Sequence, residues 1–268
     1  METLSFFLAP LVMCLILVGI HCYLGLHVLK RGVIFVDLSL AQVAGLGMTV
    51  ALLFDLEHHS TGSYLLAMGH TLVVAGVLAW ARQFEKKISQ EILIAIVYAL
   101  ASALVILVVN NVAHGAEHIK EILVGNILWV SWPEVMRTAL IYAIVAALHW
   151  HFRKPMIASS FGQPGARSTK WDFVFFALFG VVITSSVGVA GILLVFSFLI
   201  VPALVSTFFR HDIKGRLFFG WALGIAVCLV GMAISYFADL PAGAVLVVCF
   251  TVIPILMLPF LGRLRGEA

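Results

Sequence analysis

The sequence predicts an all-α polytopic membrane protein with about nine membrane-spanning helices (eight to nine) and one additional short helix. Of its 268 residues, 63% are hydrophobic and only 11% are charged. A soluble domain is about half apolar and about a quarter charged, so it could not keep this much apolar surface away from water. The apolar residues also fall into long uninterrupted runs, as membrane-spanning helices require.

Nine runs are long enough to cross a bilayer, for which a helix needs about 20 apolar residues. They occupy residues 5–28, 33–54, 63–81, 91–109, 134–152, 171–187, 188–208, 216–237 and 242–262. Residues 171–208 are too many for one crossing, and the glycines of GVAG (Gly188–Gly191) predict a break near the middle. The runs account for almost the whole chain, so we expect one transmembrane domain over residues 1–268.

The segment from His114 to Ser131 interrupts this pattern. It lies between two crossings whose facing ends should be on the same side, and its apolar part, ILVGNILWVS, is too short to span the membrane twice. We interpret it as a short outer-side or re-entrant helix. At membrane depth such a segment is tolerated only where protein or water surrounds it.

The lysines and arginines predict the orientation of the chain, because they favour cytoplasmic loops. With the N-terminus outside and the C-terminus in the cytoplasm, fourteen of the 16 Lys and Arg residues lie on the inner side. Only Lys120 and Arg137 remain outside. The opposite orientation would violate the rule at every loop.

The most informative single residue is Asp37, in the stretch KRGVIFVDLSLAQVAGLG. A charged side chain at the centre of a membrane helix costs about 2.5–3.5 kcal/mol on insertion scales, so it usually faces a bundle interior or a water-filled pathway. We interpret Asp37 as a pathway carboxylate for a cation or a proton, supported by Ser39 or Gln42. The alternative is that Asp37 caps or hydrogen-bonds a neighbouring helix.

A second group of polar residues occurs in HGAEHIKE. His114, Glu117, His118 and Glu121 follow helical spacing, so a helix would place all four on one face. Two imidazoles and two carboxylates form a plausible ligand set for zinc or manganese. The alternative is a solvated helix face. HGAEH also fits the HxxEH pattern of some zinc peptidases, but so short a match is easily met by chance.

The inner loop FFRHDIKGR (Phe208–Arg216) is a candidate docking element for a cytoplasmic partner. It is short and basic, and it lies between two expected membrane helices. Its polar residues are Arg210, His211, Asp212, Lys214 and Arg216. An ordinary positively charged inner loop is the alternative. The Walker A pattern GxxxxGK[ST] does not occur, so an ATPase, if one drives transport, is a separate chain and this chain is not an enzyme.

Five stretches, in this order, resemble the integral-membrane permeases of bacterial ABC importers for zinc, manganese and iron. They are LGLHVLKRGVIFVDLSLAQVAGLG, ISQEILIAIVYALASALVILVV, HGAEHIKEILVGNILWVSWPEV, DFVFFALFGVVITSSVGVAGILLVFSFLIVPALVS and YFADLPAGAVLVV. Each is weak alone, but their number and order are specific, and together they cover nearly the whole chain.

The resemblance implies a homodimeric or paired permease in the bacterial inner membrane, two cytoplasmic ATPase subunits and an extracytoplasmic metal-binding protein. It implies a transported divalent metal ion, no permanently bound cofactor and no nucleic-acid partner. In the family the second helix commonly carries an Asp followed four residues later by a His. Asp37 matches the Asp, but the His is replaced by Ala41, or by Gln42 in a shifted alignment.

A proton- or sodium-coupled secondary carrier is the competing function, with Asp37 as the proton site. Such carriers often contain inverted repeats and broken helices near the membrane midplane. The sequence shows no clear internal repeat. We therefore favour the membrane subunit of an ATP-driven metal importer.

Overall fold

The computed structural model describes residues 2–57, 60–85, 87–112, 115–162 and 168–264. In these ranges the chain forms helices joined by turns, and no β-strand occurs in them. The all-α prediction is therefore confirmed for the described part of the chain. The helices are α1 (Glu2–Arg31), α2 (Val36–Leu52), α3 (Thr61–Ala81), η1 (Arg82–Phe84), α4 (Gln90–Val109), α5 (Gly115–Val124), η2 (Ile127–Trp129), α6 (Trp132–His151), α7 (Arg153–Phe161), α8 (Thr169–Phe209), α9 (Ile213–Ala238) and α10 (Ala242–Leu264).

Six helices are long and apolar enough to cross a membrane, namely α1, α3, α4, α8, α9 and α10. A seventh span results if α6 and α7 are taken together, although the chain bends by 79° between them. Helix α2 is also apolar but has only 17 residues, which corresponds to about 26 Å at 1.5 Å per residue. A multi-pass membrane protein is thus confirmed.

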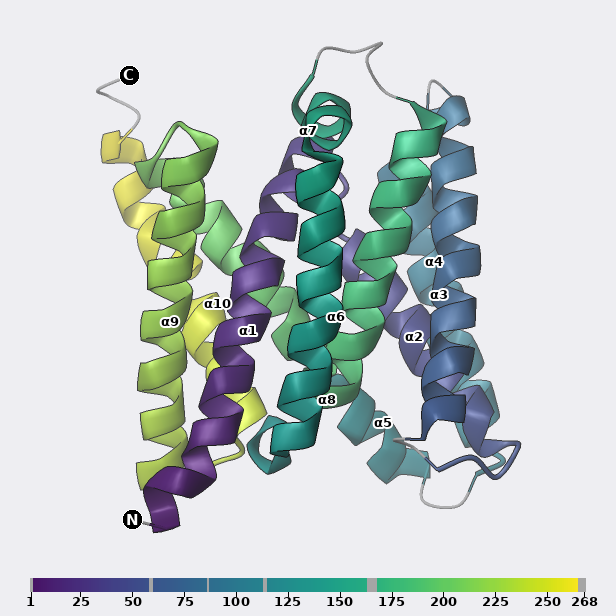
Figure 1. The fold of residues 1–268 in the computed structure, drawn as a ribbon, viewed down its shortest axis with the longest axis vertical. Helices are drawn as coiled ribbons and strands as arrows, with labels where there is room; N and C mark the ends of the chain where they lie inside the picture. The colour runs from purple at the N-terminus through teal and green to yellow at the C-terminus, as the bar shows by residue number, and fades with distance from the viewer. Residues whose placement is uncertain (1, 58–59, 86, 113–114, 163–167, 265–268) are drawn as a thin grey trace.

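Helix α8 contains the break that the sequence predicts. Its 41 residues would form a rod of about 60 Å, twice the thickness of a bilayer core. The backbone leaves the helical conformation at Gly191, with φ 74° and ψ 163°. The two halves run in opposite directions, as the change from dark to light green shows (Figure 1).

The break in α8 is packed directly against the segment that follows α5. Gly125 also has a positive φ, 69°, and a Cβ atom on either Gly125 or Gly191 would collide with the backbone of the other segment. The amide of Asn126 donates a hydrogen bond to the carbonyl of Val189 at 3.2 Å. The short helix expected between His114 and Ser131 therefore exists as α5, and glycine is required at both points of contact.

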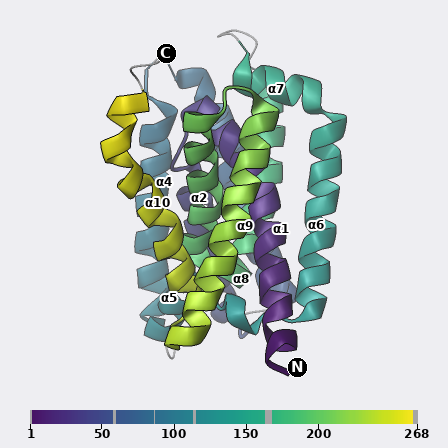
Figure 2. The ribbon, with the colours of Figure 1, turned by 90° about the vertical axis from the view of Figure 1, so that its left-hand side faces the viewer.

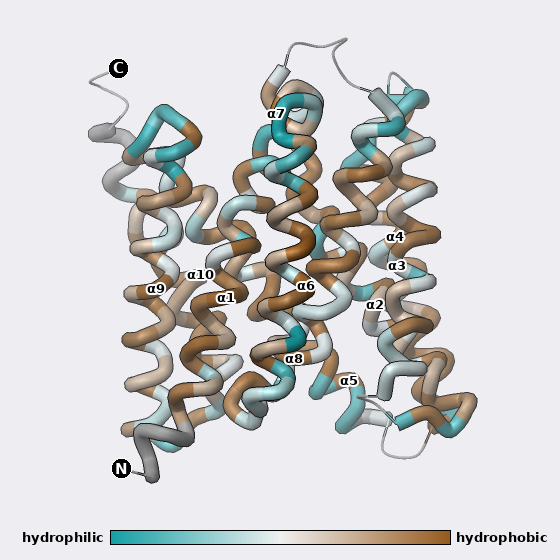
Figure 3. Tube along the Cα trace, viewed as in Figure 1, coloured by the Kyte–Doolittle hydropathy of each residue, from teal (hydrophilic) through white to brown (hydrophobic). Residues whose placement is uncertain are grey.

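The bundle has two ends, which we name after the short helices that lie there. Helix α7 lies at the end where α1 finishes, α2 starts and α10 finishes, and we call this the α7 end (Figure 1). Helix α5 lies at the other end, where α1 starts, which we call the α5 end. A view turned by 90° shows the same separation of the start of α1 and the end of α10 (Figure 2). Hydrophobic residues predominate along the middle of the bundle and hydrophilic residues gather towards both ends (Figure 3).

Helix α8 forms the centre of the fold. It packs against α1, α2, α3, α9 and α10, and 72% of its most apolar window is buried, against 22% for α4 and for α10. Phe175, Phe176, Phe179 and Phe198 are fully buried along it. Helices α4 and α10 instead expose large apolar side chains, as lipid-facing helices do.

Two of the cations expected in inner loops are not in loops. Arg31 is the last residue of α1 and Arg82 is the first residue of η1, and both side chains are buried. The charge rule treats all such cations alike and does not distinguish a solvated cation from a buried and paired one.

Candidate translocation site

Asp37 lies in the first turn of α2, at the α7 end, and its side chain is completely buried. Neither carboxylate oxygen has a hydrogen-bond partner among the described residues. The alternative that Asp37 caps or bonds a neighbouring helix therefore gains no support from the residues around it. A buried carboxylate without a partner is strongly destabilised when charged, so it needs compensation from a proton, water or a cation.

The two polar neighbours suggested for Asp37 lie on the same helix. Ser39 is fully buried and its hydroxyl has no hydrogen-bond partner among the described residues, and Gln42 is also buried. Ala41, one turn after Asp37, is buried too and provides no ligand atom. Since α2 packs against α3, α4 and α8, Asp37 and Ser39 lie inside the bundle with no hydrogen-bond partner in the described part of the chain.

The histidine and glutamate residues of α5 are only partly described. His114 lies outside the described residues. Among the others, Glu117 is exposed, Glu121 is half-buried, and His118 is buried with its Nε2 3.3 Å from the Thr49 hydroxyl at the end of α2. In the described part of the chain, no group of three or more His, Cys, Asp or Glu residues is arranged to hold a metal ion.

The basic loop between α8 and α9 is ordered by its own hydrogen bonds. Asp212 caps α9, accepting a hydrogen bond from the Gly215 amide at 2.7 Å, and Arg216 donates to the Arg210 carbonyl at 2.9 Å. The Gly215 amide also lowers the pKa of the Asp212 carboxyl, which stays charged. His211 and Lys214 are exposed, so the loop presents a fixed charged surface.

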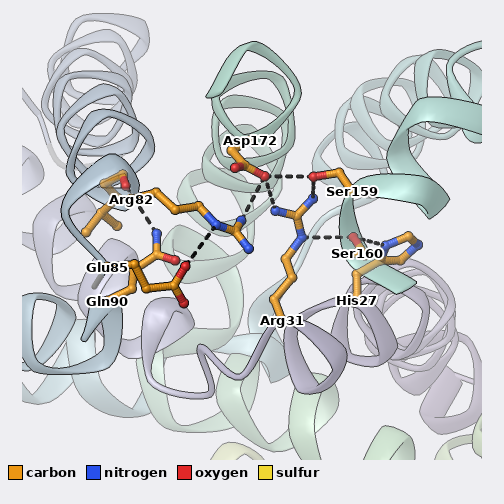
Figure 4. Close-up of polar contacts among 9 residues, drawn as sticks. His27, Arg31, Arg82, Glu85, Gln90, Ser159, Ser160 and Asp172 are labelled. Carbon is orange, nitrogen blue, oxygen red and sulfur yellow. Dashed lines mark hydrogen bonds and ion pairs between the residues drawn. The ribbon is translucent and has the colours of Figure 1, made fainter. Parts of the chain in front are cut away.

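The structure also contains a buried charged cluster that the sequence reasoning missed (Figure 4). Asp172, at the start of α8, accepts from Arg31 of α1 at 2.6 Å and pairs with Arg82 of η1 at 2.8 Å, in both cases through Oδ1. The side chains of Asp172 and Arg31 are at most 2% exposed. One carboxylate thus joins the ends of α1, α3 and α8 at the α7 end.

Helix α7 is attached to the same cluster by two serines. Ser159 donates to Asp172 at 2.8 Å, and Ser160 accepts from Arg31 Nε at 2.8 Å. The Ser160 hydroxyl also lies 2.8 Å from Nδ1 of His27, one turn earlier on α1. The Arg31 guanidinium stacks on Phe175, 4.0 Å from the ring centroid, an arrangement that favours a buried arginine.

One feature of the sequence could have revealed this cluster. Asp172 stands at the start of the apolar run 171–187, so it is an ionisable residue in a membrane segment in the same way as Asp37. Its partners, however, are distant in sequence, and Arg31 precedes it by 141 residues. Without the fold, nothing in the sequence pairs these residues.

An all-helical multi-pass bundle with an uncompensated carboxylate inside it is typical of a membrane transport protein. The model of the ABC 3 transport family matches residues 4–260. The chain belongs to this family, and it is therefore the membrane-embedded subunit of an ABC transporter.

Relatives and a solved structure agree with this assignment. The chain is 21% identical to a probable iron transport system membrane protein of Haemophilus influenzae, over 88% of this chain and 83% of the relative. It is 21% identical to a manganese transport system membrane protein of Synechocystis, over 93% and 82% respectively. The structure of PsaBC from Streptococcus pneumoniae has a similar fold, with a TM-score of 0.74, 19% identity and coverage of 92% of this chain and 88% of that one.

Proposed function

We propose that this protein is the membrane subunit of an ATP-driven importer of a divalent transition metal ion, with Asp37 as the carboxylate of the pathway. The observation that carries the proposal is that Asp37 is fully buried with both oxygens unpaired among the described residues. The names of the manganese and iron transport relatives support a transition metal as cargo. The metal is the substrate, and the chain holds no permanent cofactor.

The orientation that we propose places the α7 end in the cytoplasm, with nine crossings. These are α1, α2, α3, α4, α6, the two halves of α8, α9 and α10. The distribution of cations supports this orientation. Five cations flank helix ends at the α7 end: Lys30, Arg153, Lys154, Lys170 and Lys214. At the α5 end, helix α5 and the first turns of α6 contain only two cations, Lys120 and Arg137.

ATP hydrolysis then belongs to a separate cytoplasmic chain. Two exposed elements at the α7 end are suitable for docking it. The first is the loop with Arg210, His211, Asp212, Lys214 and Arg216, held by its own hydrogen bonds. The second is α7, which is bent by 79° from α6 and bonded to the charged cluster. Movement of α7 would reach α1, α3 and α8 directly through Asp172.

At the α5 end we propose that an extracytoplasmic metal-binding protein delivers the ion to a homodimer in the bacterial inner membrane. His114, Glu117, His118 and Glu121 are the candidate ligands on that side, and Ser39 and Gln42 support Asp37 deeper inside. Helix α2 has no histidine, so its candidate ligand atoms are the oxygens of Asp37, Ser39 and Gln42. Carboxylate and amide carbonyl oxygens are ligands that suit manganese.

The test measures uptake of radioactive manganese and zinc by cells that depend on this transporter. Asp37→Asn should abolish uptake while the protein remains in the membrane at the normal amount. Asp239→Asn is the matched control, because Asp239 is exposed in a turn at the α5 end with a φ of 52°, which asparagine tolerates. Full uptake by Asp37→Asn would remove this residue from the pathway.

A second arm separates the two classes of transporter. Uptake should stop when ATP is depleted and should persist when a proton uncoupler is added with ATP maintained. The reverse pattern would indicate a secondary carrier with Asp37 as its proton site.

A further inference from the structure

A partly enclosed pocket of about 120 Å³ opens at the α5 end, among α2, α3, α6 and α8. Its polar lining includes Ser60 and Tyr64 from the start of α3, Glu134, Arg137 and Thr138 from the start of α6, and Ser185 from α8. Gly188 of α8 also lines it, and a Cβ atom there would meet nothing within 4 Å. The pocket lies at the opposite end of α2 from Asp37.

Arg137 brings a positive charge to this pocket. Its guanidinium lies 4.8 Å from the ring centroid of Tyr64, and among the described residues it forms no ion pair. The acidic residue one turn earlier, Glu134, also lines the pocket, and one of its carboxylate oxygens is directed to the start of α6. Its Oε2 accepts hydrogen bonds from the Ser131 amide at 2.8 Å and the Ser131 hydroxyl at 2.7 Å, which caps α6.

Thr138 adds a hydroxyl group that is available to a ligand. It lines the pocket, it is 5% exposed, and it has no hydrogen bond to another described residue. Its neighbours in the wall are already occupied. Thr184 donates to Thr71 at 3.1 Å and Ser185 donates to the Val182 carbonyl at 3.0 Å. Arg137 and Thr138 are therefore donors available to a ligand, together with the Tyr64 hydroxyl, which forms no hydrogen bond to another described residue.

We propose that this pocket binds an oxyanion, the carboxylate or phosphate group of a ligand. A guanidinium binds such groups with two parallel hydrogen bonds, and a buried hydroxyl adds a third donor. The volume accommodates one such group with a few water molecules. The pocket lies near the end of α2 whereas Asp37 lies in its first turn, so this site is distinct from the one proposed around Asp37.

The same chemistry has two possible sources. One is a free anion, such as the carboxylate of a chelator that accompanies a metal ion. The other is the phosphate of a lipid headgroup, because Trp129 and Trp132 are exposed at this end and tryptophans mark membrane–water interfaces. The experiment distinguishes these sources after it has tested the site itself.

The full-length protein in maltoside micelles, which contain no phosphate, is titrated with citrate or inorganic phosphate. The thermal unfolding midpoint is followed, with sodium chloride at matched ionic strength as the reference. Citrate or phosphate should raise the midpoint of the natural protein, and Arg137→Gln should weaken the titration about tenfold or more, since a charge-assisted bond is worth about 1.5–3 kcal/mol.

Lys120→Gln is the matched control, since Lys120 is an exposed cation at the same end that does not line the pocket. It should titrate like the natural protein. Arg137→Gln must also unfold at the normal midpoint in chloride, which separates lost binding from lost folding. Equal titration of Arg137→Gln and the natural protein, or no response of the natural protein, would overturn the proposal.

A second arm repeats the titration in phospholipid nanodiscs. If the response to citrate persists there, the site takes a free anion. If it disappears in nanodiscs but is present in maltoside, lipid phosphate occupies the same donors. This arm is read only after a response in maltoside has been observed. It identifies the source of the oxyanion, and the maltoside titration tests the site itself.

Discussion

Two buried aspartates at the α7 end are handled by the protein in opposite ways. Asp172 is in contact with Arg31, Arg82 and Ser159, whereas Asp37 has no hydrogen-bond partner among the described residues. Both are at least 98% buried. Removing one member of a buried ion pair is strongly destabilising because it leaves the other charge buried and uncompensated, whereas a buried carboxylate without a partner costs free energy in the folded state. Hydrogen bonding therefore distinguishes the two aspartates, whereas burial does not.

Asp172→Asn should have the largest effect on stability. It leaves the guanidinium groups of Arg31 and Arg82 buried without their shared carboxylate, a change that costs about 3–5 kcal/mol when one member of a buried pair is removed. The measurement is thermal unfolding of the purified protein in detergent, together with its amount in the membrane. An unchanged midpoint would mean that the two arginines find other partners, and the comparison with Asp37 would no longer hold.

Ser160→Ala should have an intermediate effect. The hydroxyl accepts from Arg31 and also contacts His27, and the loss of a buried hydrogen bond to a charged group costs about 1.5–3 kcal/mol. Ser159→Ala, on the same turn of α7, is the companion variant, since Ser159 bonds directly to Asp172. Destabilisation by Ser159→Ala alone would confine the cluster to Asp172 and its immediate partners.

Asp37→Asn should have the smallest effect on stability. Unlike the substitutions in the charged cluster, it should leave the protein equally stable or slightly more stable. Because no described residue bonds to the carboxylate, removing the charge eliminates a desolvation cost without breaking a contact. We expect an unfolding midpoint equal to or slightly above that of the natural protein. A loss of more than about 2 kcal/mol, a size typical of a broken buried contact, would show that Asp37 has a structural partner.

Much of the fold could be predicted from the sequence because bilayer physics is simple. Apolar runs of about 20 residues predicted the helices, and the GVAG glycines predicted the break that the structure places at Gly191. Asp37 stood out because a lone carboxylate in an apolar run is unusual; the structure shows that it is buried, and its role in the pathway stays a prediction.

The charged cluster could not be predicted because its members come from four separate segments. Arg31, Arg82 and Asp172 each resemble ordinary residues at the end of a membrane helix, and only the packing of α1, η1 and α8 brings them together. The pocket beside Arg137 was missed for a similar reason. The charge rule placed Arg137 on the outer side but could not show that Glu134, one turn away, is engaged in capping α6.

The contact between Gly125 and Gly191 restricts how this protein can move. Neither position has room for a side chain, so the α5 segment and the bend of α8 lie backbone against backbone with nothing between them to yield. If the two arms of α8 tilt during a transport cycle, the segment after α5 must shift with them. A rearrangement of α8 inside the bundle would then displace the segment at the α5 end. A protein docked on that surface could then sense which way the interior is open.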